Sequence, residues 1–204
     1  MNPQEISIQL CAIIFSDIRT PEKICKYFSC IPTGVVNKKL ITEYIAFNVF
    51  IVDYTLYAYG SNRADYHQIK NLLFDKFVNE FWSGLYSNNM LSDDVNILNN
   101  RLPAYAEIYE GHEPNDSKKI GYCCAQILKF TGYKEHIDHN PGEYANFRFD
   151  FFDAATLALI KQTIEILGRN TSSSSPEDTV PSGNAKNMGC SLFILLAILA
   201  WLLS

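Results

Sequence analysis

Apolar residues recur with a helical period along much of the chain. The clearest stripe comprises Phe74, Phe77, Val78, Phe81, Trp82 and Leu85. Apolar side chains three and four positions apart share one face of a helix, which packs that face against a core. The stripe therefore predicts a helix that begins near Asn62 and ends near Tyr86.

Two further stripes predict helices with signals at both ends. The first comprises Leu157, Ile160, Ile164 and Leu167, and the second comprises Ile120, Cys123, Cys124, Ile127 and Leu128. Asp153 is the candidate N-cap of the first helix and Gly168 is its candidate stop, because aspartate and glycine favour those positions. Asn115 or Asp116 caps the second helix, and Gly132 closes it.

The stretch from Val35 to Tyr59 is apolar on nearly every face, as membrane spans and buried helices both are. Glu43, Asn48 and Asp53 nevertheless lie inside it. Acidic side chains at membrane depth are costly. The stretch therefore predicts a central, mostly buried helix of the domain.

Two more segments predict helices. One stripe comprises Leu91, Val95, Leu98, Leu102 and Tyr105, and Pro103 is expected to kink or divide that helix. The other segment, Ile6 to Phe15, is apolar enough to resemble the middle of a signal peptide. No Lys or Arg precedes it, however, and no small-residue cleavage site follows before Asp17. It is interpreted as an amphipathic or buried helix, and secretion is not expected.

One stretch departs from the helical period. Between Tyr144 and Phe151, apolar and polar residues alternate at Phe147, Phe149 and Phe151, which is typical of a strand. A single short strand has no partner here, so the stretch is interpreted as an extended lead-in or a fraying helix start. Together the patterns predict an all-α fold, a single bundle-like domain of about six to eight helices over residues 1–168.

The composition changes abruptly after Gly168. Residues 169–187 contain four consecutive serines, two prolines and no aromatic residue. Such a segment cannot bury enough surface to offset its ordering entropy, so it is predicted to be a flexible linker. Residues 188–204 carry no charge. As a helix they extend about 25 Å, against a hydrocarbon core of about 30 Å, and they are predicted to be a C-terminal hydrophobic helix that anchors the protein in a membrane.

The membrane anchor is assigned to Leu192, Phe193, Ile194, Leu195, Leu196, Ile198, Leu199 and Trp201. Lys186 precedes the segment and no basic residue follows it, which predicts a single-pass, tail-anchored protein with its N-terminal domain in the cytoplasm. A core helix, a cleaved lipid-anchor signal and a helix lying flat in the interface are weaker alternatives. The long polar linker opposes a core helix, and the lack of a secretory signal opposes a cleaved lipid anchor. The lack of a polar face opposes a helix lying flat in the interface. Cys190 is a candidate for S-acylation, with an inert thiol as the simpler interpretation.

Charge and cysteine content narrow the function further. The chain has a formal net charge of −5 and no basic run longer than two residues. Non-specific nucleic-acid binding needs a dense positive stripe, so no nucleic-acid partner is expected. The six cysteines show no framework spacing and lie mostly in apolar helical patterns. They indicate reduced thiols in a reducing compartment rather than disulfides.

The sequence contains no recognisable catalytic motif. It lacks a Gly-x-Ser-x-Gly elbow, a phosphate-binding glycine loop, a dinucleotide fingerprint and the Glu-x-x-His pair of di-iron bundles. His136 and His139 lie three positions apart, so on a helical turn they would form a candidate metal site together with a carboxylate. A solvated polar turn is the competing interpretation, because Asn140, Pro141 and Gly142 follow at once. No cofactor is predicted.

The acidic stretch from Asp93 to Asp116 is the main candidate for a binding surface. Its central part holds Glu107, Glu110 and Glu113, interleaved with Tyr105 and Tyr109. Carboxylates and aromatic side chains in this arrangement predict a docking face for a basic protein partner. An ordinary solvated helix face is the alternative.

Two functional hypotheses follow from these patterns. The first is a membrane-tethered adaptor or assembly subunit, whose cytosolic domain binds a protein at the surface of the lipid bilayer and is not an enzyme. The second is a helical enzyme or small-molecule-binding domain, for a lipid or a metal, tethered to the membrane. The lack of a catalytic motif favours the first.

Overall fold

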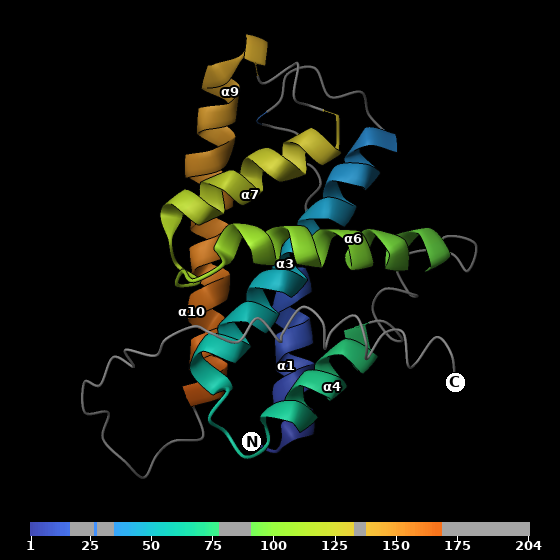
Figure 1. The fold of residues 1–204 in the computed structure, drawn as a ribbon, viewed down its shortest axis with the longest axis vertical. Helices are drawn as coiled ribbons and strands as arrows, with labels where there is room; N and C mark the ends of the chain where they lie inside the picture. Colours follow the sequence, from blue (N-terminus) through green and yellow to red (C-terminus); the bar gives the residue numbers. More distant parts are fainter. Residues whose placement is uncertain (17–26, 28–34, 78–90, 133–137, 169–204) are drawn as a thin grey trace.

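The computed structural model describes residues 1–16, 27, 35–77, 91–132 and 138–168 (Figure 1). Its helices are α1 (Pro3–Ser16), α3 (Val35–Gly60), α4 (Tyr66–Lys76), α6 (Leu91–Tyr109), α7 (Ser117–Phe130), α9 (Pro141–Asn146), the π-helix η3 (Phe147–Asp153) and α10 (Ala154–Gly168). These ranges contain no strand, so the predicted all-α fold is confirmed for the described part of the chain. The predicted linker and C-terminal hydrophobic helix, residues 169–204, lie outside the described residues.

The central element of the domain is α3. Its side chains are buried almost without interruption from Thr42 to Leu56, and α1, α4, α6, α7 and α10 all pack against it. These neighbours explain why the segment is apolar on nearly every face, and they confirm the prediction of a central buried helix. Among the described helices, none combines the length and the apolar character that crossing a membrane requires.

The N-terminal helix α1 packs against α3, α4 and α10. Ile6, Leu10 and Ile14 lie one helical turn apart on its buried side. The helix begins with a capping box, in which the Glu5 amide donates to Oδ1 of Asn2 at 2.9 Å and the Asn2 amide donates to Oε2 of Glu5 at 3.0 Å. The helix predicted between Ile6 and Phe15 is therefore part of the domain core.

The chain forms one continuous helical column from α9 through η3 into α10 (Figure 1). Neither an extended lead-in nor a fraying helix start is found at residues 147–153, because they form a π-helix. Its wider turn buries Phe147 and Phe152 and leaves Phe149 58% exposed. The alternation at Phe147, Phe149 and Phe151 therefore does not mark the buried positions, because Phe149 is exposed and Phe152 is buried.

The helix caps agree with the sequence at α7 and differ at α10. The Asp116 side chain accepts the first free amides of α7, and Gly132 follows the helix with a φ of +86°. Both features were predicted. Asp153 does not cap α10, because α10 continues directly from η3. Its carboxylate instead faces Nε of Arg148 at 3.6 Å.

Two other predicted helix boundaries need correction. α4 begins at Tyr66 rather than near Asn62, and the predicted end near Tyr86 lies outside the described residues. α6 continues without a break to Tyr109, so Pro103 does not divide it. Proline lacks the backbone amide that a helix normally uses. Leu102 and Tyr105, on either side of it, are buried, and α6 packs against α3 and α7.

Aromatic side chains fill the space between α3, α6 and η3. The Phe47 ring stacks on Phe152 with 4.9 Å between centroids and meets Tyr105 edge-on at 5.4 Å. The Phe50 ring lies 5.4 Å from that of Tyr109. Both tyrosines belong to α6, so this aromatic core fixes the position of the acidic end of that helix.

Candidate functional site

The residues predicted to bind a partner lie at or just beyond the end of α6, and they differ in how exposed they are. Glu107, Glu110 and Glu113 are exposed, whereas Tyr105 and Tyr109 are fully buried. The tyrosines are four positions apart and therefore share the face of α6 that packs on the core. They cannot contact a docked protein while the domain is folded, so they are removed from the predicted surface. Partner binding by the three glutamates stays a prediction.

A different tyrosine lies near Glu113. Tyr59, near the end of α3, is 48% exposed. Partial burial and the nearby charge of Glu113 raise the pKa of Tyr59 above its usual range. We call Glu107, Glu110, Glu113 and Tyr59 the acidic surface. Within the part of the chain that the structure describes, none of its three carboxylates forms an ion pair, so their charge is available to a partner.

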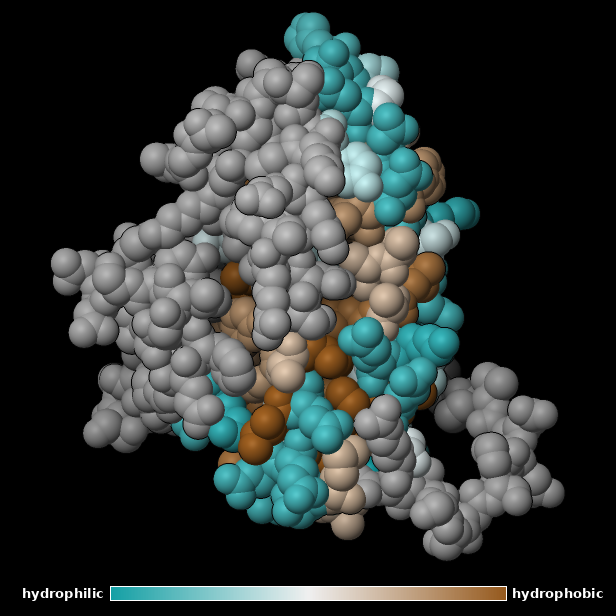
Figure 2. Space-filling model, turned by 180° about the vertical axis from the view of Figure 1, so that it is seen from behind, coloured by the Kyte–Doolittle hydropathy of each residue, from teal (hydrophilic) through white to brown (hydrophobic). Residues whose placement is uncertain are grey.

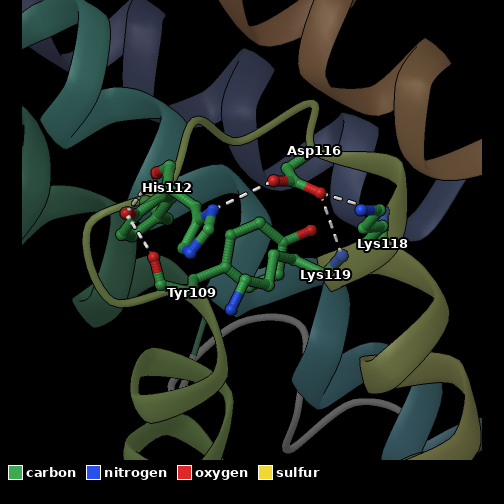
Figure 3. A network of polar contacts seen from close by, with 6 residues as sticks. Tyr109, His112, Asp116, Lys118 and Lys119 are labelled. Atoms are coloured by element: carbon green, nitrogen blue, oxygen red, sulfur yellow. Dashed lines mark hydrogen bonds and ion pairs between the residues drawn. The ribbon is translucent and has the colours of Figure 1, made fainter.

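The turn between α6 and α7, which contains Glu110 and Glu113, is tied down by a network of polar contacts (Figure 3). The Tyr54 hydroxyl of α3 lies 2.7 Å from the carbonyl oxygen of His112 and 3.1 Å from that of Tyr109. Within the turn, Nδ1 of His112 lies 3.0 Å from a carboxylate oxygen of Asp116. Gly111 has a φ of +71°, a conformation that glycine adopts without strain. The turn is therefore tied both to α3 and to the start of α7.

Asp116 connects this turn to α7. Its Oδ1 accepts the amide of Lys119 at 3.2 Å and that of Lys118 at 2.9 Å. The Lys119 amide foremost, followed by His112 and the Lys118 amide, holds the pKa of the Asp116 carboxyl below its usual range.

We expect Asp116→Ala to lower the melting temperature of the protein by a few degrees, because alanine cannot replace a capping oxygen. Asp116→Asn keeps an oxygen at the same place and should retain most of the lost stability. Thermal unfolding followed by circular dichroism compares the two variants. Equal losses in both would assign the effect to the charge of Asp116 rather than to capping.

The interior holds a charge pair that the sequence patterns did not assign to a site. Glu43 is fully buried in α3, and its Oε2 lies 2.7 Å from Nε of Arg101 in α6. The Arg101 guanidinium lies over the ring of Phe130 in α7, 3.7 Å from its centroid. This pair thus connects three helices. Glu43 needs the arginine because removing a carboxylate from water is costly, whereas the Arg101 side chain remains 22% exposed.

Other polar groups surround this pair. Burial foremost, together with the charge of Glu43, raises the pKa of Tyr105 well above its usual range. Burial also raises the pKa of the Cys123 and Cys124 thiols. Thiols of this kind are not nucleophiles near neutral pH, since the thiolate is the reactive form. The two cysteines are therefore not expected to act as nucleophiles. Among the described residues, Oε1 of Glu43 and the hydroxyl of Tyr105 have no hydrogen-bond partner.

Arg148 of η3 connects that helix to α7 and also pairs with an acid of η3 itself. Arg148 donates to the carbonyl oxygen of Ser117 at 3.2 Å and faces Asp153 at 3.6 Å. Its guanidinium occupies the place that a side chain at residue 121 would take, so a Cβ added to Gly121 would clash with it. Glycine at this helical position therefore makes room for the arginine.

We expect Gly121→Ala to lower the free energy of unfolding by about 1 kcal/mol, although alanine normally favours a helix over glycine by a similar amount. The added methyl group displaces Arg148, which then loses its contacts with Ser117 and Asp153. In an Arg148→Ala background the same replacement should stabilise the protein. Urea unfolding of the four members of this double-mutant cycle measures the effect. The same sign in both backgrounds would contradict the assigned role of the glycine.

Several predicted site residues lie outside the described ranges. His136 is one of them, and its predicted metal-site neighbour His139 is exposed just before α9. Over the ranges that the structure describes, no group of three or more His, Cys, Asp and Glu residues is arranged to hold a metal ion. Cys190 and the anchor residues from Leu192 to Trp201 also lie outside. Metal binding, acylation and anchoring stay predictions.

Over the described residues, fold and site together define a helical domain with a buried Glu43–Arg101 pair between its helices and an acidic surface at the end of α6. Comparison of the chain with family models, with curated proteins and with solved structures found no match. The functional assignment therefore depends on the chain's own residues.

Proposed function

We propose that the protein is a tail-anchored adaptor, whose helical domain presents the acidic surface to a basic protein partner at the cytoplasmic face of a membrane. The observation that carries the proposal is the state of Glu107, Glu110 and Glu113. They are exposed and, over the described residues, free of ion pairs, and they lie on a frame tied to the core. A rigid array of one charge sign steers an oppositely charged partner and fixes its orientation.

The tether supports the same proposal. Residues 188–204 are uncharged, and their apolar side chains each favour insertion by a few tenths of a kcal/mol at the centre of a membrane helix. A flexible linker of the length of residues 169–187 spans about 25 Å. The helical domain would therefore remain close to the bilayer while keeping the freedom to turn the acidic surface toward a membrane-bound partner.

The test is co-purification of the partner with the full chain from detergent-solubilised membranes. The wild-type chain should retain a stoichiometric protein partner. A variant that carries Glu107→Lys, Glu110→Lys and Glu113→Lys should retain less of it by a factor of about ten or more, because the reversed charges repel a basic partner. Quantitative mass spectrometry of the bound proteins measures the change. Raising the salt concentration should weaken binding to the wild-type chain in the same direction.

A matched variant controls for the change in net charge. It reverses three exposed acidic residues elsewhere on the domain, namely Asp75, Asp150 and Glu165. This variant should keep the partner at the wild-type level. Equal loss from both variants, or loss from neither, would contradict a role for the acidic surface.

The charged interior supports a second function, the binding of a small polar molecule between α3, α6 and α7. Oε1 of Glu43 and the Tyr105 hydroxyl are buried without hydrogen-bond partners among the described residues, and the charges of Glu43 and Arg101 both act on Tyr105. Buried polar atoms normally have partners, and a ligand is one way to supply them. Native mass spectrometry of the full chain would detect a retained molecule, and Glu43→Gln should release it.

A further inference from the structure

Apolar side chains are exposed on both α1 and α10, two helices that pack against each other. Ile8 is 42% exposed and Leu157 is 43% exposed. Ala12, one turn beyond Ile8, and Ala158, next to Leu157, are exposed as well. Figure 2 shows hydrophobic residues exposed next to hydrophilic ones on the side of the molecule opposite to that in Figure 1. We call Ile8, Ala12, Leu157 and Ala158 the apolar face.

The apolar face lies on the helix from which the rest of the chain continues. α10 ends at Gly168, and Leu157 precedes that end by three helical turns, or about 16 Å. The predicted linker of residues 169–187 spans about 25 Å as a flexible coil. It is therefore long enough to return residues 188–204 to the apolar face.

The order of polar and apolar residues on the exposed side of α10 matches the order of the linker and the apolar segment that follow it. The half of its exposed side nearest Gly168 is polar, with Lys161, Gln162 and Glu165, and the apolar half lies farther away. The polar linker would run past the first half and place the apolar segment over the second. As a helix, residues 188–204 are about 25 Å long, close to the length of about 22 Å for α10.

Residues 188–204 also need an apolar environment whenever no membrane is at hand. Exposing each Leu, Ile or Phe of the segment to water costs about 1.5 to 3 kcal/mol relative to burial. The segment contains many such residues and no charge. The apolar face is within reach of the same chain and carries exposed large apolar side chains of its own.

We propose that residues 188–204 dock on the apolar face in the lipid-free protein and leave it on insertion into a bilayer. This proposal rests on the proposed function, because it assigns a second position to the same anchor. Docking keeps the protein soluble before it reaches its membrane. Insertion exchanges apolar contacts within the chain for contacts with lipid.

A photo-crosslinker tests the docked state in the full chain. Leu157 is replaced by benzoylphenylalanine, and the protein is irradiated without lipid or detergent. Tandem mass spectrometry should find a crosslink from position 157 to residues 188–204 within a single chain. Liposomes of phosphatidylcholine and phosphatidylserine, added before irradiation, should lower its yield at least tenfold. The same probe at Gln68, an exposed residue of α4, should give no crosslink to the segment.

A second placement of the probe, at Ala158, guards against a folding defect caused by replacing Leu157. The proposal is overturned if neither position crosslinks to residues 188–204, if the crosslinks join two different chains, or if liposomes leave the yield unchanged after they have taken up the protein. Uptake by liposomes is measured separately by flotation. A crosslink in a chain that liposomes never take up would support docking and contradict the anchor.

Discussion

Replacing Arg101 by methionine is expected to lower the free energy of unfolding by about 3 kcal/mol, because it leaves the Glu43 carboxylate buried without its partner. Removing one member of a buried pair typically costs more than the pair itself contributes, since the remaining charge keeps its full desolvation penalty. Methionine preserves most of the apolar stem beside Phe130, so the loss reports mainly on the charge. Urea unfolding of the full chain in a non-denaturing detergent, followed by circular dichroism, measures it.

The double variant Glu43→Gln with Arg101→Met provides the control. It removes both charges at once, so it should recover at least half of the lost stability. A loss below about 1 kcal/mol for Arg101→Met alone would contradict the buried position of Glu43, because an exposed ion pair contributes about that much at most. If the double variant is less stable than the single one, the polar contacts of Glu43 matter more than its charge.

The helical elements could be predicted because their signals are local. Apolar residues three and four positions apart identified α7 and α10, and Asp116 and Gly132 identified both ends of α7. The sequence pattern of η3 was misleading for a physical reason. A π-helix has more residues per turn than an α-helix, so its buried aromatic residues do not follow the usual spacing. The same continuous column explains why Asp153 pairs with Arg148 and does not act as a cap.

The acidic surface was only partly predictable. Carboxylates in sequence identified Glu107, Glu110 and Glu113, but a tyrosine has both an apolar ring and a polar tip and so fits a surface or a core equally well. Tyr105 belongs to the core. Tyr59 belongs to α3, which is distant from α6 in the sequence, and it is exposed near Glu113. Only the three-dimensional packing of α3 against α6 decides between the two.

The sequence pattern located the buried acids of α3, but it could not predict which basic residues pair with them. Glu43 and Asp53 were conspicuous as acids inside an apolar stretch. In the structure, Glu43 pairs with Arg101, and Oδ1 of Asp53 lies 2.9 Å from Nζ of Lys70 in α4. Burial raises the pKa of Asp53 even though the nearby lysine opposes the shift. The acids inside this apolar helix thus mark the points at which ion pairs join α3 to α4 and α6. The partners lie far away in the sequence, so only the fold identifies them.

Removing residues 169–204 is expected to move the protein almost completely from the membrane fraction to the soluble fraction. The segment from 188 to 204 supplies all of the predicted affinity for lipid, and over the described residues no other helix is suited to span a bilayer. Carbonate extraction of membranes, followed by immunoblotting of pellet and supernatant, measures the distribution. Equal distribution of the full and shortened chains would contradict the anchor, and with it the proposed adaptor.

Two variants separate insertion from simple loss of chain. Leu196→Lys with Leu199→Lys keeps the length of the chain but places two charges near the centre of the segment, each costing about 2.5 to 3.5 kcal/mol on insertion. It should behave like the shortened chain. Deletion of residues 169–187 alone removes the linker and keeps the anchor, so the protein should remain in the pellet. Because that deletion also shortens the reach of residues 188–204, it should abolish their docking on the apolar face in the lipid-free protein while leaving insertion intact.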